Sequence, residues 1–112
     1  MSTPNLLTLS LALNFLPTVS AEIAGNMSSL RYLNLDYNDL SVVPIVTHSL
    51  TELRYLSMVG NPITTLSNTS LLGVANQLEY LDIRMLNLSI LEVSFKFKLM
   101  MLRFSTGRFL LC

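Results

Sequence analysis

The stretch LRYLNLDYNDL, residues 30–40, decides the fold of this chain. Its apolar residues occupy positions 1, 4, 6 and 11 of a repeating pattern, and an asparagine occupies position 9. The pattern also occurs 24 residues earlier and 23 residues later, at Leu6, Leu9, Leu11, Asn14 and Leu16, and at Leu53, Leu56, Met58, Asn61 and Ile63. Three copies in register predict a solenoid in which each copy forms one structural unit.

The pattern is the L-x-x-L-x-L-x-x-N-x-L template of the leucine-rich repeat. It predicts an α/β solenoid, a right-handed superhelix of four to five turns. A parallel sheet would form the concave face, and mostly loops and short helical turns would form the convex face. We expect repeats over residues 6–29, 30–52, 53–77 and 78–91. Because side chains alternate along a strand, positions 4 and 6 should point into the core and positions 3, 5 and 7 to the concave surface.

The pattern weakens toward the C-terminal end. The fourth copy has Leu86 at position 9, with Asn87 one place later. Either the bend holds an extra residue there, or the run of inward asparagines lapses. A fifth copy lacks the asparagine and would use Leu99, Leu102, Phe104, Gly107 and Phe109. We therefore expect residues 92–112 to be a degenerate fifth repeat or a disordered tail.

Composition narrows the class of protein. The chain has 112 residues, enough for one domain, and its formal net charge of zero favours no nucleic-acid partner. Charged residues make up 12%, against roughly 25% in ordinary soluble domains. Mean hydropathy is +0.53. We expect glycans, neighbouring repeats or a membrane to keep such a chain in solution.

The ends of the chain indicate a piece of a longer array or a truncated product. The single cysteine, Cys112, allows no internal disulfide, and no cysteine cluster of the kind that caps secreted repeat proteins is visible. Uncapped ends would favour self-association. No apolar run approaches the roughly 20 residues of a membrane-spanning helix, so membrane association would come only through a parent protein. Residues 6–16 could also be read as the apolar part of a signal peptide, but their repeat register favours a strand.

The residues expected on the concave face form columns across successive strands. A tyrosine recurs at position 3 in three repeats, and tyrosine offers a large rigid contact area with one hydroxyl. Tyrosine also stacks well on neighbouring strands, so a structural role stays open beside ligand binding. The two aspartates and the arginine could equally be a solvated surface. The candidate binding residues are Tyr32, Asn34, Asp36, Tyr55, Ser57, Tyr80, Asp82 and Arg84.

Position 9 predicts a ladder of inward asparagines, formed by Asn14, Asn38 and Asn61. The chain bends at this position, so its backbone groups lack strand partners. Buried backbone groups need hydrogen bonds, and an amide side chain can both donate and accept them.

Three N-glycosylation sequons begin at Asn26, Asn68 and Asn87. Chance alone predicts a similar number in a chain this rich in serine and threonine, so their placement is more informative. None falls at position 3, 5 or 7. Glycans at these sites would leave the concave sheet accessible.

No pattern for catalysis is present. The one histidine, His48, falls on a predicted convex loop without a second histidine or a cysteine, and we expect an ordinary surface residue. The four glycines form no phosphate-binding loop. The sequence therefore predicts no enzyme activity, no metal and no cofactor.

Three runs extend the match beyond the generic template: LRYLNLDYNDLSVVP (30–44), LRYLSMVGNPITTL (53–66) and NQLEYLDIRMLNLSILE (76–92). The phrases GNPI (60–63) and LLGVANQLEYLDI (71–83) resemble the chaoptin family of insect cell-adhesion proteins, over roughly residues 6–92. This resemblance implies a cell-surface protein of many repeats, held by a lipid anchor and active in adhesion.

The leading hypothesis is a protein-binding segment of an extracellular adhesion or receptor-type protein. Its concave sheet would engage a protein ligand or a second copy of the same protein. Two alternatives stay open. One is a cytoplasmic scaffold or regulatory module whose sequons are unused, and the other is a truncated product without independent function.

Overall fold

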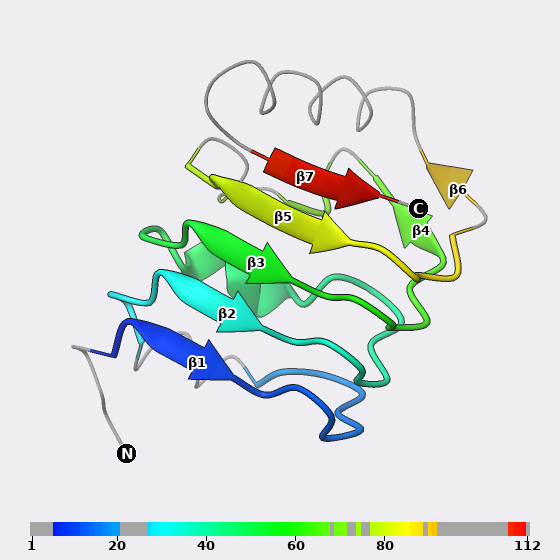
Figure 1. The fold of residues 1–112 in the computed structure, drawn as a ribbon, viewed down its shortest axis with the longest axis horizontal. Helices are drawn as coiled ribbons and strands as arrows, with labels where there is room; N and C mark the ends of the chain where they lie inside the picture. The colour runs from blue at the N-terminus through cyan, green and yellow to red at the C-terminus, as the bar shows by residue number, and fades with distance from the viewer. Residues whose placement is uncertain are drawn as a thin grey trace.

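The computed structural model describes residues 6–20, 27–67, 69–71, 74, 77–88, 90–91 and 108–111. One short strand from each copy of the repeat enters a five-stranded sheet, and a smaller sheet and a 3-10 helix lie elsewhere in the chain (Figure 1). The large sheet contains β1 (Thr8–Ser10), β2 (Tyr32–Asn34), β3 (Tyr55–Ser57), β5 (Tyr80–Ile83) and β7 (Arg108–Leu111). The other elements are η1 (Ile45–Ser49), β4 (Thr65–Leu66) and β6 (Ile90–Leu91).

The large sheet is parallel throughout, in the order β1-β2-β3-β5-β7. The strand register of the first four repeats is the one that the template predicts. Leu9, Leu33, Leu56 and Leu81 pair across the sheet as one column of position-4 residues. The prediction of a solenoid with a parallel sheet is therefore confirmed for the strand order and for the register of these four repeats.

The strands are short, yet the hydrogen bonds between repeats continue beyond them. The N–H at position 8 donates to the position-7 carbonyl of the next repeat, as from Tyr37 to Val59 at 2.7 Å. The residue at position 8 has a positive φ in all four copies: Leu13, Tyr37, Gly60 and Met85. This left-handed residue turns the chain out of the strand while its amide stays paired, and the asparagine at position 9 follows it.

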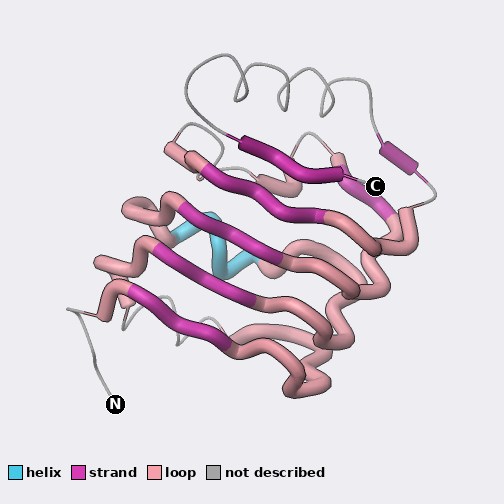
Figure 2. The backbone as a smooth tube through the Cα atoms, viewed as in Figure 1, coloured by secondary structure: helices cyan, strands magenta, loops and turns pink. Residues whose placement is uncertain are grey.

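One core lies behind the sheet. The buried side chains of repeats two and three at positions 1, 4, 6 and 11 belong to it: Leu30, Leu33, Leu35, Leu40, Leu53, Leu56, Met58 and Ile63. The loops on the opposite side complete it with Val43, Val46, Leu50, Leu66, Leu71 and Val74. Figure 2 shows the arrangement, with the sheet strands in a row and loop segments connecting them.

The side opposite the sheet is more regular than expected. Pro44 precedes η1, where the Thr47 hydroxyl donates to the Pro44 carbonyl at 2.8 Å. The next two repeats contribute β4 and β6, which pair in parallel through Thr65–Ile90 and Leu66–Leu91. The sequence predicted mostly loops and helical turns there and missed this second ladder.

The fifth strand lies later in the sequence than the template suggested. Residues 99, 102, 104 and 107 of the expected fifth copy lie outside the described residues. Phe109 was expected at position 11, but its backbone pairs with that of Leu81, which holds position 4. The expected register of the fifth copy was therefore wrong. The degenerate sequence supplied no asparagine from which to count it.

Candidate protein-binding face

We call the side of the large sheet that points away from the core the sheet face. Its first column is a stack of three tyrosine rings. Tyr32 and Tyr55 lie 4.1 Å apart between ring centroids, at an interplanar angle of 12°. Tyr55 and Tyr80 lie 4.4 Å apart at 5°. Since each ring restrains the next, the column presents a fixed row of ring edges and hydroxyls.

Tyr55 occupies the middle of this stack. Burial, followed by the neighbouring Tyr32 and Tyr80 hydroxyls, raises the pKa of the Tyr55 phenol above its ordinary value. A phenolate between two rings would lose solvation without gaining a counterion. The column therefore acts as a neutral, hydrogen-bonding surface.

The second column, at position 5, is less accessible than the sequence implied. Asn34 is half-buried, but Ser57 is 1% exposed and Asp82 is 3% exposed. Their burial means that these two side chains position their neighbours and present little contact area of their own. The amide oxygen of Asn34 accepts the Asp36 N–H at 2.9 Å, which holds that side chain against its own strand.

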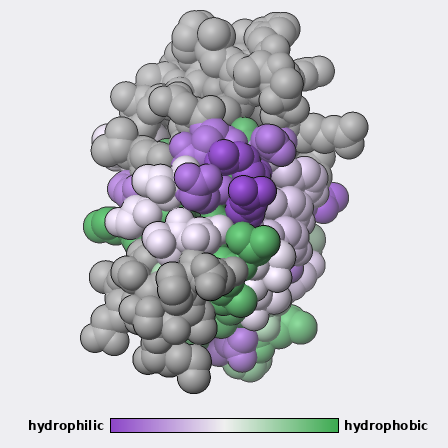
Figure 3. Space-filling model, turned by 90° about the vertical axis from the view of Figure 1, so that its left-hand side faces the viewer, coloured by the Kyte–Doolittle hydropathy of each residue, from purple (hydrophilic) through white to green (hydrophobic). Residues whose placement is uncertain are grey.

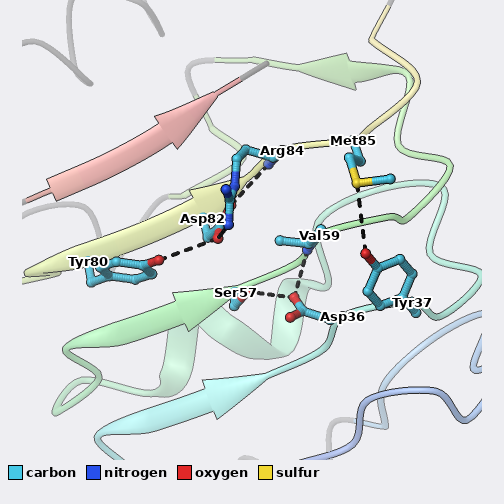
Figure 4. Close-up of polar contacts among 8 residues, drawn as sticks. All are labelled: Asp36, Tyr37, Ser57, Val59, Tyr80, Asp82, Arg84 and Met85. Atoms are coloured by element: carbon cyan, nitrogen blue, oxygen red, sulfur yellow. Dashed lines mark hydrogen bonds and ion pairs between the residues drawn. The ribbon is translucent and has the colours of Figure 1, made fainter.

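Asp36 connects two repeats. Its Oδ1 accepts the hydroxyl of Ser57 and the Val59 N–H, the latter at 2.7 Å (Figure 4). Both donors belong to the following repeat. This carboxylate therefore ties the end of β2 to the end of β3 while remaining half-exposed.

The mixed charges of the fourth repeat form a compact ion pair. Arg84 donates from Nε to Asp82 Oδ1 at 2.9 Å and from Nη2 to Oδ2 at 2.7 Å (Figure 4). The Tyr80 hydroxyl adds a donor at 3.4 Å. Burial raises the pKa of Asp82, but the hydrogen bonds and charge of Arg84 outweigh it, so the net pKa lies below its ordinary value. The pair is fixed, which the sequence did not indicate.

The position-9 asparagines bond the backbone of their own repeat and of the preceding one. Asn38 accepts the N–H groups of Asn14 and Leu16 at 3.1 and 3.0 Å, and its amide donates to the carbonyls of Leu11 and Leu35. Asn61 accepts from Leu40 and donates to Leu35 and Met58 in the same way. Asn14 is exposed, and its side-chain amide donates to the carbonyls of Leu11 and Ala12 within its own repeat.

The fourth repeat continues without such an asparagine. Leu86 packs partly buried against the core, whereas Asn87 is exposed. The Asn87 N–H donates to the Ile63 carbonyl at 3.0 Å, so the backbone stays in step while the amide turns outward. Of the three sequon asparagines, Asn87 is thus accessible, and Asn26 and Asn68 lie outside the described residues.

Sequence reasoning missed a group of exposed apolar residues at the C-terminal ends of the strands, which we call the apolar edge. Large apolar residues with left-handed backbones are exposed there, with Leu13 at 70%, Phe15 at 77% and Met85 at 63%. Tyr37 lies among them, and its hydroxyl donates to the Met85 sulfur at 3.8 Å (Figure 4). The available signal was a bulky residue at position 8, where a turn usually carries glycine or asparagine.

At the opposite side, where the strands begin, repeats two to four carry polar residues, whereas the first repeat exposes Leu7. Position 2 carries Arg31, Arg54 and Glu79, and Glu52 forms an ion pair of 3.7 Å with Arg54. Figure 3 faces this end of the molecule and shows hydrophilic residues gathered beside apolar ones. In repeats two to four the strand starts are thus polar, whereas large apolar residues are exposed at the strand ends.

Two shallow hollows formed by described residues lie opposite the sheet. One of about 280 Å³ is lined by Val19, Val42 and Ile45, and one of about 380 Å³ lies near His48, Thr65 and Ser70. His48 Nε2 lies 3.3 Å from the Ser70 carbonyl oxygen. Within the described ranges no group of three or more His, Cys, Asp or Glu side chains could hold a metal ion. No helix among those residues is long and apolar enough to cross a membrane.

Comparison with known proteins agrees with the repeat pattern. The leucine rich repeat family matches residues 4–63. The chain is 76% identical to chaoptin from Tribolium castaneum over 92 residues. These residues are 82% of this chain and 12% of that protein. It is 52% identical over 73 residues to chaoptin from Drosophila melanogaster, or 65% of this chain and 6% of that protein. The chain thus spans a small part of the length of the relatives it matches.

Proposed function

Because the chain belongs to the leucine-rich-repeat family and is chaoptin-like, we propose that it is a protein-binding segment of a cell-surface adhesion or receptor-type protein. Its ligand is another protein or a second copy of the same protein. The role is recognition and not catalysis. The segment acts in the extracellular space, as part of a longer chain.

The single observation that carries this proposal is the tyrosine stack on the sheet face. Three rings at 4.1 and 4.4 Å form an ordered amphipathic surface, half-buried and not covered by the core. Rigid aromatic residues lose little conformational entropy on binding and supply much of the energy in protein interfaces. Asn34 at the end of β2 and Asp36 just beyond it extend the same face.

The proposal also includes the finer geometry of the repeat array. The chain forms a right-handed superhelix of four to five turns, with the sheet face on its concave side. In such a shape successive repeats turn their position-3, position-5 and position-7 side chains toward one region of space. A convex protein surface then contacts several repeats at once.

Cell aggregation tests this function. The chain is displayed on the surface of cultured cells by a lipid anchor, and the displaying cells are mixed with labelled cells that display it or do not. Replacement of Tyr32, Tyr55 or Tyr80 by Ala should weaken binding by about 1–2 kcal/mol each without unfolding the chain. Labelled cells that join only when they display the chain would identify a second copy as the ligand.

The matched control replaces Val42 and Ile45 by Ser, since both are exposed apolar residues away from the sheet face. Their replacement should leave aggregation unchanged. Normal aggregation by the triple tyrosine variant would refute binding through the sheet face.

Glycosylation gives an independent test of location. Asn87 is exposed and lies off the sheet face, so a glycan there would not obstruct ligand binding. We propose that at least one of Asn26, Asn68 and Asn87 is glycosylated. The intact mass of the endogenous protein, measured before and after enzymatic removal of N-glycans, should fall. An unchanged mass would contradict an extracellular, glycosylated protein.

A further inference from the structure

The tyrosine stack does not offer all of its ring faces to a ligand. Tyr55 is covered on both sides, by Tyr32 and by Tyr80. Tyr32 is stacked on one side only, and its other face turns toward β1, where its register partner is Thr8. Among the described residues, no further ring contacts Tyr32. Among those residues its outer face is therefore not covered by another ring, and Thr8 lies beside it at this end of the stack.

The residues of the first repeat beside this face have small side chains. Positions 3, 5 and 7 of the first repeat hold Thr8, Ser10 and Ala12, and the first two are exposed. The same positions of the second repeat hold Tyr32, Asn34 and Asp36. The change in side-chain size between β1 and β2 makes a ledge, which we call the Tyr32 step.

The Tyr32 step also carries negative charge. Both hydrogen bonds that the Asp36 carboxylate accepts fall on Oδ1. In the described part of the chain Oδ2 accepts none, and no basic side chain pairs with this carboxylate. An aromatic face is itself electron-rich and attracts cations, arginine most often. Ring and carboxylate therefore favour the same kind of ligand.

The spacing decides how many cations the step would hold. Asp36 lies four residues after Tyr32 and two residues beyond the end of β2, a span of roughly 13 Å for an extended chain. One side chain spans too little to contact both. Arg31 adjoins Tyr32 at the start of β2 and is exposed, so its charge opposes a cation approaching from that end. A partner would thus approach from the Asp36 end.

We propose that the Tyr32 step binds a basic segment of a partner protein, with an arginine stacked on the outer face of Tyr32 and a second basic side chain at Asp36. The planar guanidinium stacks on an aromatic face better than the compact ammonium of lysine, which selects arginine at the first position. This inference rests on the proposed function, because it names the chemistry of the ligand on the same face.

Peptide titration tests the step directly. The probe is the blocked peptide Arg-Pro-Pro-Pro-Arg, whose polyproline spacer holds its arginines roughly 12 Å apart. The readout is the aromatic NMR signals of the four tyrosines in the full chain. Saturable shifts should be largest for Tyr32 and should weaken with added salt. The same peptide with citrulline, which is planar but uncharged, should bind far more weakly.

Variants separate the two subsites. Tyr32→Leu should weaken peptide binding about 2- to 30-fold. Asp36→Asn should also weaken it while keeping the Oδ1 bonds to Ser57 and Val59. Arg31→Ala should strengthen it. Tyr37→Leu is the matched control, since Tyr37 lies at the apolar edge, and it should change nothing.

Absence of saturation, equal binding of the citrulline peptide, or tighter binding of a blocked Tyr-Pro-Pro-Pro-Tyr peptide would overturn the inference. These results are distinct from failure of the proposed function. If the tyrosine variants lose aggregation while no basic peptide binds, the adhesive face stands and the basic ligand is wrong. If peptide binds and the tyrosine variants aggregate normally, the Tyr32 step stands and adhesion through this face is wrong.

Discussion

Tyr37 lies over Gly60 so closely that a Cβ at position 60 would stand 2.5 Å from Tyr37 Cδ1. Both residues occupy position 8 of their repeats, and both have a left-handed backbone. The ring crosses the glycine and its hydroxyl reaches the Met85 sulfur in the repeat beyond (Figure 4). Three consecutive repeats are therefore joined at the apolar edge by one surface side chain.

Replacement of Gly60 by Ala should destabilise the chain by about 2 kcal/mol. The left-handed backbone, with φ at +73°, is one cost, and the contact with the Tyr37 ring is a second. The free energy of unfolding in urea measures the sum. In a Tyr37→Ser background the same replacement should cost only about 1 kcal/mol, because the contact is gone. An identical cost in both backgrounds would show that the ring does not constrain position 60.

Replacement of Asn38 by Ala should cost about 1–3 kcal/mol, because it leaves buried and partly buried N–H and carbonyl groups of two repeats without partners. Asn14 provides the matched control. It is exposed, and its side-chain amide bonds only carbonyls of its own repeat, which water can satisfy, so Asn14→Ala should cost less than about 0.5 kcal/mol. Urea unfolding of the two variants compares them, and equal losses would refute a role for burial.

Acid should weaken the Asp82–Arg84 pair. The pKa of Asp82 is lower in the folded chain than when unfolded, so its stabilisation is present above the unfolded value of about 3.9. It is lost as pH falls through the folded pKa. Arg84→Gln should cost about 1 kcal/mol near neutral pH, a modest value because Arg84 is half-exposed. Urea unfolding across the acid range should show this difference shrinking, and a constant difference would contradict the linkage.

Alkaline pH should destabilise the tyrosine stack. The pKa of Tyr55 is raised by folding, so the neutral phenol contributes its full stability below the unfolded value of about 10. That contribution is lost as pH rises toward the folded pKa. Thermal unfolding above about pH 10 should be less steeply pH-dependent in Tyr55→Phe than in the parent chain. An equal slope in the two chains would contradict this linkage.

Periodicity predicted those parts of the fold that depend on one residue type recurring at one spacing. Leucine at position 4 identifies the strand and its register, since a shift of one residue would turn the apolar side chains to solvent. Asparagine at position 9 identifies the bend, because its amide bonds backbone groups there that have no strand partner. Where that marker is absent, as beyond Leu86, the register of the following strand was misplaced.

Accessibility on the sheet face was beyond such reasoning. Ser57 and Asp82 share position 5 with the half-exposed Asn34, yet both are buried. Their burial depends on the size and direction of neighbouring side chains in other repeats. The bridging of two repeats by Asp36 is likewise a contact that no single repeat encodes.

The sequence by itself determined the repeat, the parallel register of the first four strands and the residues that fill the core, because the alternation of side chains along a strand is a local property. Only the tertiary structure decided that Tyr37 covers Gly60, that β4 pairs with β6 and that Asp36 accepts hydrogen bonds from the following repeat. These features join residues from different repeats. They depend on how far each side chain reaches across the 4.8 Å or so between strands, which a repeat template does not specify.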